Sequence, residues 1–150
     1  MLQDALLAYT HFVAIIATVA TVSIEALLCR PGLNQRWLKL LGRVDLLYLV
    51  AAGLAVTTGL LRAFLGVKGW AFYQNNPVFW LKIGLFVAVG LISILPTMRF
   101  IGWGKRLTNA ADATLTDSEI SATARIIYIE LFLLALIPLC ASLMARGFGY

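Results

Sequence analysis

Four long apolar runs leave this chain few options for its fold. They cover residues 5–28, 44–66, 78–103 and 125–146, and each has about 20 or more residues, enough to cross a hydrocarbon core of ~30 Å as a helix. Of the 150 residues, 61% are hydrophobic and only 13% are charged, against about a quarter in a soluble domain. The sequence therefore predicts one all-α domain, an antiparallel bundle of four transmembrane helices in a lipid bilayer.

Lysine and arginine gather in two of the three predicted connections. The eight residues are Arg30, Arg36, Lys39, Arg43, Arg99, Lys105, Arg106 and Arg125, whereas the second connection has only Lys68. Positively charged loops stay on the cytoplasmic side of a membrane. We therefore expect an inner (plasma) membrane protein with both termini outside, and we assign the net charge of +5 to its loops, not to nucleic-acid binding.

Residues typical of turns and helix caps separate the four apolar runs. Pro31-Gly32 ends the first run, and a short basic loop is expected after it. An aromatic-rich turn is expected at residues 67–76, and Pro77 suits the first turn of the third helix. Thr116 and Glu119 have the spacing of a capping box, so the fourth helix should begin near Asp117 in water. Pro96 predicts a kink near the far end of the third helix.

Polar and small side chains recur at helical spacing along the first two runs. The first set is His11, Ala14, Thr18, Thr21 and Glu25, and the second is Asp45, Tyr48, Ala52, Ala55, Gly59 and Arg62. Steps of three and four place each set on one helix face. Ala51, Ala55, Gly59 and Ala63 also form a ladder of small side chains, which lets another helix approach closely. That ladder predicts packing within the bundle or a homodimer through this face of the second helix.

Five ionisable side chains interrupt the apolar runs, and such residues within a bilayer usually mark function. Depth sorts them into an outer layer of His11, Arg62 and Lys82 and an inner layer that contains Glu25 and Glu130. The inner layer predicts a mixed acid–base network, Glu25, Arg43, Asp45, Arg99, Arg125 and Glu130. Two structural readings stay open: the inner carboxylates pair with arginines to lock the bundle, and Arg62 and Lys82 extend to lipid headgroups.

The outer layer has the chemistry of a haem site. A neutral imidazole such as that of His11 can ligate haem iron, and Arg62 and Lys82 lie at a depth where they could meet the propionates. The chain has no second histidine. Copper is a weaker hypothesis because the soft ligands, Met98, Met144, Cys29 and Cys140, are spread over depth. The two cysteines are expected near opposite faces as unpaired, inert thiols.

One segment carries a resemblance to known families. Residues 76–82 read Asn-Pro-Val-Phe-Trp-Leu-Lys and are followed by Pro96-Thr97. In these features the chain resembles small bacterial four-helix membrane proteins of unknown function. More distantly it is similar to the superfamily of the CopD-type copper-resistance proteins and the HemJ-type membrane protoporphyrinogen oxidase.

The distant resemblance implies roles for individual residues. It places haem b on His11 and a catalytic function on Lys82, and it matches Arg43, Gly59-Leu60 and Glu130 to positions of the HemJ type. The chain departs from that pattern at Ile129, where the HemJ type has asparagine.

The preferred hypothesis is therefore a haem-b-associated redox protein, with His11 as metal ligand and Arg62 and Lys82 in the cofactor site. If the protein is an enzyme, it is a membrane oxidoreductase with Lys82 as a proton acceptor. Two alternatives stay open. One is a non-enzymatic membrane module, either a transporter component or a partner subunit. The other is copper or proton passage, in which Glu25, Thr18 and His11 would need bridging waters to form a relay.

Overall fold

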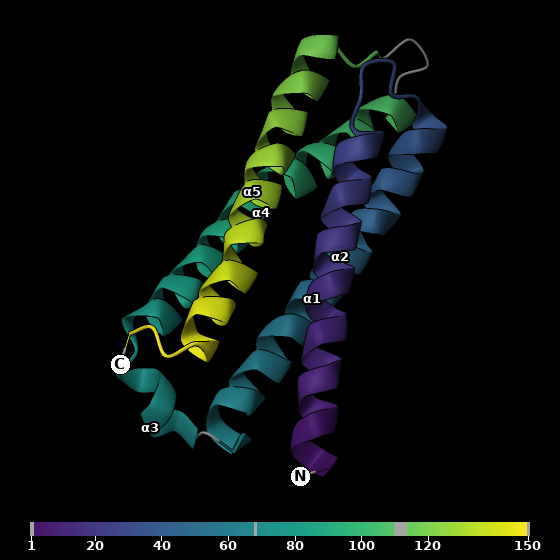
Figure 1. Ribbon diagram of the computed structural model, residues 1–150. Helices are drawn as coiled ribbons and strands as arrows, with labels where there is room; N and C mark the ends of the chain where they lie inside the picture. The colour runs from purple at the N-terminus through teal and green to yellow at the C-terminus, as the bar shows by residue number, and fades with distance from the viewer. Residues whose placement is uncertain (1, 68, 110–113, 150) are drawn as a thin grey trace.

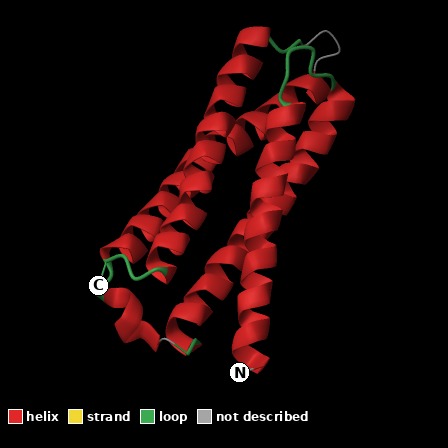
Figure 2. Ribbon diagram, in the orientation of Figure 1, coloured by secondary structure: helices red, strands yellow, loops and turns green. Residues whose placement is uncertain are grey.

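The computed structural model describes residues 2–67, 69–109 and 114–149, and all regular structure in these ranges is helical (Figures 1 and 2). Lys68 and Asp112 lie outside the described residues. Four of the helices are long and apolar enough to cross a membrane, as the sequence predicts. In chain order the helices are α1 (Leu2–Leu28), α2 (Gln35–Leu65), α3 (Gly69–Gln74), α4 (Pro77–Asn109) and α5 (Asp117–Ala145).

Local side-chain chemistry sets the helix starts. The Asn34 side chain accepts a hydrogen bond from the Trp37 N–H and caps α2. Thr116 and Glu119 form the expected capping box, and α5 begins at Asp117. The Asn76 side chain accepts from the N–H groups of Val78 and Phe79, which caps α4 ahead of Pro77. These bonds satisfy backbone donors that a helix start leaves free.

Two predicted connections were wrong, and one helix extends beyond its predicted membrane span. Arg36, Lys39 and Arg43 do not lie in a loop but on the first turns of α2, which begins at Gln35. The aromatic-rich connection is not a simple turn, because it contains the short helix α3. Helix α4 continues to Asn109 instead of ending at residue 103. Helices α2 and α4 extend beyond their apolar runs and α3 lies outside them, in segments where hydropathy gives no signal.

The four long helices form two antiparallel pairs, α1 with α2 and α4 with α5 (Figure 1). The N- and C-termini lie at the same end of the molecule, where α3 connects the two pairs (Figure 1). We call this the terminal end, and the opposite end, with the α1–α2 and α4–α5 connections, the loop end. An even number of crossings places both termini on one side of a membrane, and N-out/C-out remains our prediction for which side that is.

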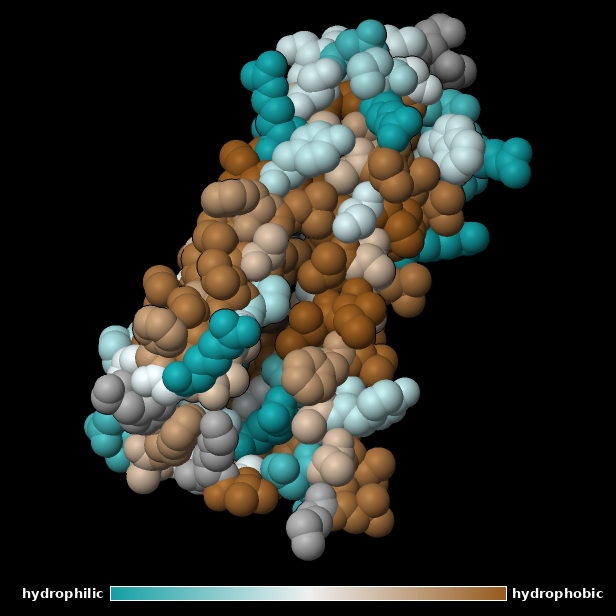
Figure 3. Space-filling view, viewed as in Figure 1, coloured by the Kyte–Doolittle hydropathy of each residue, from teal (hydrophilic) through white to brown (hydrophobic). Residues whose placement is uncertain are grey.

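The molecular surface fits a bilayer. Apolar side chains cover the long middle of the face in Figure 3, and hydrophilic side chains gather toward its two ends. The buried core, which includes Val22, Leu41, Ile120 and Ile127, joins the two helix pairs. Because α1 has 27 residues and α4 has 33, their lengths of about 40–50 Å at 1.5 Å per residue exceed the hydrocarbon core. The helix ends therefore project beyond it.

The small-residue ladder of α2 is used within the chain. Ala51, Ala55 and Ala63 are buried, and Gly59 lies against the His11 side chain of α1. Small side chains here let α1 and α2 approach closely. At Gly59 this face is covered by α1, and a homodimer through the second helix stays a prediction. The two cysteines are free and buried, as expected.

Candidate functional site

The His11 side chain of α1 lies directly on α2 at Gly59. A Cβ atom added to Gly59 would lie 2.9 Å from Cε1 of the imidazole, which is closer than the ~3.5 Å at which carbon atoms pack without strain. Only glycine leaves room for the ring at this position. The contact fixes the ring against α2 in the half of the molecule nearer the termini.

Thr58 orients the ring. Its hydroxyl oxygen lies 3.0 Å from His11 Nδ1 and 2.6 Å from the carbonyl oxygen of Leu54, one turn earlier in α2. A hydroxyl has one proton to donate, and a carbonyl can only accept. The shorter contact favours use of the Thr58 proton on Leu54, and Nδ1 then donates its own proton to Thr58. This arrangement assigns the proton to Nδ1 and leaves the lone pair of Nε2 available.

Two cations lie in the same layer as the imidazole. Arg62 of α2 and Lys82 of α4 interact electrostatically with His11 and with each other. The guanidinium carbon of Arg62 lies 5.6 Å from the centre of the Phe12 ring, and Lys82 Nζ lies 5.8 Å from that of Phe79. Within the described ranges neither cation makes an ion pair with a carboxylate. The structure thus brings together all three members of the predicted outer layer, from three helices, and in the described part of the chain it gives Arg62 and Lys82 no carboxylate as an ion-pair partner.

The Asn-Pro motif of residues 76–82 organises the helix starts and aromatic side chains next to the outer layer. Asn76 is fully buried, and its side-chain amide donates to the carbonyl of Phe148, which ties the C-terminal turn to the start of α4. Trp70 of α3 stacks on Phe64 with ring centres 4.8 Å apart and meets Phe79 edge-on at 6.0 Å. The motif therefore holds α3, α4 and the C-terminal turn together, which fixes the start of the helix that carries Lys82.

The inner layer is an acidic cluster, not the predicted mixed network. Glu25, Asp45 and Glu130 are 2%, 7% and 1% exposed and interact electrostatically with one another. Asp45 accepts a hydrogen bond from the Thr97 hydroxyl at 2.8 Å. Glu25 and Glu130 each have a buried carboxylate oxygen, Oε1, that has no hydrogen-bond partner among the described residues.

The predicted arginine partners do not reach these carboxylates. Arg43 and Arg125 are exposed, and Arg99 donates to the Thr123 hydroxyl at 2.9 Å. In the described part of the chain, the one salt bridge joins Arg106 to Glu119 at the loop end. Helical spacing gives the depth of a side chain in the membrane, but it does not fix which side of the helix faces the bundle interior. A shift of one residue turns a side chain by about 100° around the helix axis. Arginines at the right depth can therefore still face outward.

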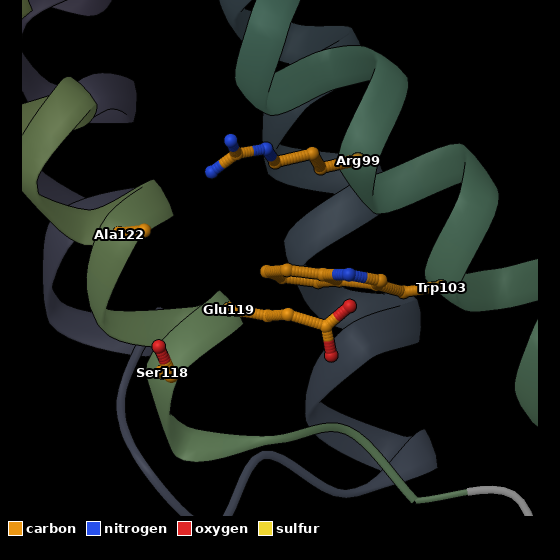
Figure 4. A pocket seen from close by; sticks show the side chains of 5 residues that line it. All are labelled: Arg99, Trp103, Ser118, Glu119 and Ala122. Atoms are coloured by element: carbon orange, nitrogen blue, oxygen red, sulfur yellow. The ribbon is translucent and has the colours of Figure 1, made fainter.

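A pocket of about 310 Å³ lies between α4 and α5 near the loop end. Figure 4 shows the Arg99 guanidinium reaching from α4 toward α5, with the Trp103 indole between it and Glu119. Ser118 and Ala122 complete the lining. Both charged side chains have protein partners, Arg99 with Thr123 and Glu119 with Arg106. The pocket is therefore a polar opening at the loop end.

Sequence reasoning missed Thr58, Ser93 and Thr123. Thr58 lies three residues after Ala55, so the same spacing rule that selected the polar face of α2 also admits it. Ser93 hydrogen-bonds the buried Tyr48 of the acidic cluster, and Thr123 holds Arg99. Hydroxyl residues are common in membrane helices and often bond only to their own helix backbone, as Thr18 does with Ala14. The sequence therefore does not distinguish Thr58, Ser93 and Thr123 from such residues.

Comparison with known proteins gives one match. The family described as "Predicted membrane protein (DUF2214)" matches residues 3–149. No curated protein and no solved structure matches the chain.

Proposed function

The chain belongs to the DUF2214 family of membrane proteins, and we propose that it binds haem b through His11 and works as a redox protein of the inner membrane. The single observation that carries this proposal is the hydrogen bond from His11 Nδ1 to Thr58. Histidines that ligate metals donate their other ring N–H to a fixed acceptor, which sets the tautomer and the ring orientation. In this protein Thr58 is that acceptor, and Nε2 is the ligating atom.

The donor set favours haem over a bare metal ion. A protein-bound zinc or copper ion needs three or four protein ligands, and the described residues hold no group of three or more His, Cys, Asp or Glu side chains that could supply them. A porphyrin brings four nitrogen ligands of its own, so one imidazole is enough to attach it. His11, the one histidine of the chain, fits a haem and does not fit a copper centre.

Arg62 and Lys82 supply the second part of the fit. Two cations that face each other without a carboxylate repel, and in partly buried positions this repulsion is weakly screened. Haem carries two propionates, which would neutralise both charges and gain charge-assisted hydrogen bonds. The proposal therefore places the propionate edge toward Arg62 and Lys82, near the terminal end of the bundle.

When bound, haem supplies one-electron chemistry, and the residues of the chain position the haem and determine its surroundings. The Thr58 bond holds the imidazole, Gly59 allows the ring to lie close to α2, and Phe12 and Phe79 place apolar surface beside the two cations. If the protein oxidises a substrate, Lys82 would accept its proton only as a neutral amine, and not while it is a cation paired with a propionate. This last role rests on the resemblance to the HemJ type.

A visible spectrum of the purified protein tests the proposal. The chain is expressed with ample haem, purified in detergent and compared with His11→Gly. We expect a Soret band in the wild type, its loss in His11→Gly, and its return when free imidazole is added to fill the space left by the side chain. A wild type without a Soret band would overturn the proposal, and so would a band that is unchanged in His11→Gly.

A further inference from the structure

Glu25 of α1 and Glu130 of α5 form a pair that the haem proposal does not use. They are 2% and 1% exposed and interact electrostatically across the two helix pairs. On each of them Oε1 is buried and finds no hydrogen-bond partner in the ranges 2–67, 69–109 and 114–149. A carboxylate oxygen left unpaired in this way is among the costliest groups that a protein can bury.

The groups around this pair come from all four long helices. Asp45 and Tyr48 face it from α2, and both interact with it electrostatically. Cys29 lies beyond the end of α1 and interacts with both Glu25 and Arg99. The remaining neighbours are hydroxyl groups of α4, Ser93, which hydrogen-bonds Tyr48, and Thr97, which hydrogen-bonds Asp45. No lysine, arginine or histidine makes an ion pair with these three carboxyl groups in the ranges that the structure describes.

Three carboxyl groups so placed cannot all be ionised. Moving an isolated carboxylate into an apolar interior costs of order tens of kcal/mol by ideal estimates, and in practice the group takes up a proton instead. Asp45 has the Thr97 hydroxyl as a donor, which favours its charged form. Glu25 and Glu130 have no donor at Oε1. Glu25 and Glu130 are therefore the two groups of the three that most favour holding a proton.

Protonation also resolves the unpaired oxygens. An ionised carboxyl group can only accept hydrogen bonds, whereas a neutral one has a donor as well. Each proton therefore removes a charge from a buried oxygen and turns an acceptor-only group into one that can also donate a hydrogen bond. A metal ion is the other group that could satisfy these oxygens, but the described residues form no set of three or more ligands that could hold one.

We propose that Glu25 and Glu130 are a proton-binding site, neutral in the resting protein, that exchanges protons with water at the loop end. The exchange would use water that enters at the pocket of Figure 4, which Arg99 lines and where Arg99 interacts electrostatically with Cys29, one turn from Glu25. The guanidinium, which keeps its proton, is not itself a proton carrier. This inference does not depend on haem, because it uses other residues at another depth.

Infrared spectroscopy of the protein in detergent tests the proposal. A protonated carboxyl group has a carbonyl band well separated from that of a carboxylate, and the band shifts when its proton exchanges for deuterium. At neutral pH we expect this band in the wild type, a loss of part of it in Glu25→Gln and in Glu130→Gln, and a shift in D₂O. Glutamine has the size of glutamate, so both variants keep the packing. Asp117→Asn, at an exposed carboxylate that does not line the pocket, is the matched control and should leave the band unchanged.

Three outcomes would overturn the proposal. The first is a wild-type spectrum without the protonated band, or with a band that neither variant reduces. The second is a band that does not shift in D₂O, because such a site holds protons without exchanging them. The third is loss of the band when Na⁺ or Ca²⁺ is added, which would make the pair a cation site.

Discussion

Replacing Gly59 with alanine tests the contact that positions the imidazole. The added Cβ would lie 2.9 Å from His11 Cε1, and unstrained carbon contacts begin near ~3.5 Å, so the ring has to recede by about 0.6 Å. This movement lengthens the 3.0 Å bond between Nδ1 and Thr58 to as much as ~3.6 Å, where a side-chain hydrogen bond is effectively lost. The variant should therefore lose about 0.5–1.5 kcal/mol of stability from this bond.

Gly53→Ala is the matched control for this change. Alanine in place of glycine within a helix by itself stabilises by about 0.5–1 kcal/mol, which would obscure the loss if Gly59→Ala were compared only with the wild type. Gly53 lies in the same helix, and an added Cβ there has no heavy atom within 4 Å. The comparison of the two variants therefore cancels the helix term and isolates the contact with His11.

The assay is thermal unfolding of both variants in one detergent, followed by circular dichroism, together with a haem titration followed at the Soret band. We expect Gly59→Ala to unfold at a lower temperature than Gly53→Ala and to bind haem about tenfold or more weakly, as for other losses of an outer-shell partner. If Gly59→Ala matches Gly53→Ala in both measurements, the reasoning about the imidazole contact is refuted.

Three further predictions follow from other parts of the structure. Arg62→Gln and Lys82→Gln should each weaken haem binding in the same titration while the Soret band stays, whereas the exposed Arg43→Gln should have no effect; equal effects at all three positions would contradict the propionate assignment. Asn76→Ala should lose about 1 kcal/mol of helix-cap stability and release the C-terminal turn, whereas Asn76→Asp keeps the cap but loses the side-chain amide donor. Limited proteolysis should cut the C-terminus faster in both variants, and an unchanged rate would contradict the role of the bond from Asn76 to Phe148. Burial raises the pKa of the Cys29 thiol to about 11, and because the thiolate is the reactive form, a maleimide at mildly alkaline pH should label this position far more slowly in the folded than in the unfolded protein, as mass spectrometry would show; equal rates would contradict its burial.

The fold could be predicted because the bilayer constrains it so strongly. A helix that satisfies its own backbone is the simplest way for an apolar run to cross a membrane, so four runs of sufficient length give four spans. The ends of α2 and α4 could not be predicted in the same way. Outside the hydrocarbon core, charged helical turns such as those of Arg36 and Lys39 have the composition of a loop. Only Asn34, the actual cap of α2, marks the boundary.

The sequence could predict how deep each side chain of the candidate site lies in the membrane, but not which way it faces around its helix. His11, Arg62 and Lys82 come together because a regular rise per residue converts sequence position into depth. The same rule placed Arg43 and Arg125 at the level of Glu25, yet both face away from the bundle interior. The angle at which each helix faces its neighbours depends on packing between helices that are far apart in the sequence. The role of Thr58 depends on the same packing and therefore could not be predicted.

The tautomer of His11 is the most direct test of the account. The chain has one histidine, so labelling with ¹⁵N-histidine gives a single pair of ring-nitrogen resonances in the protein without haem. The account predicts a protonated Nδ1 and an unprotonated Nε2, with the Nε2 resonance lost or strongly shifted when haem is added. A proton on Nε2, or a single averaged signal from a freely exchanging ring, would contradict it.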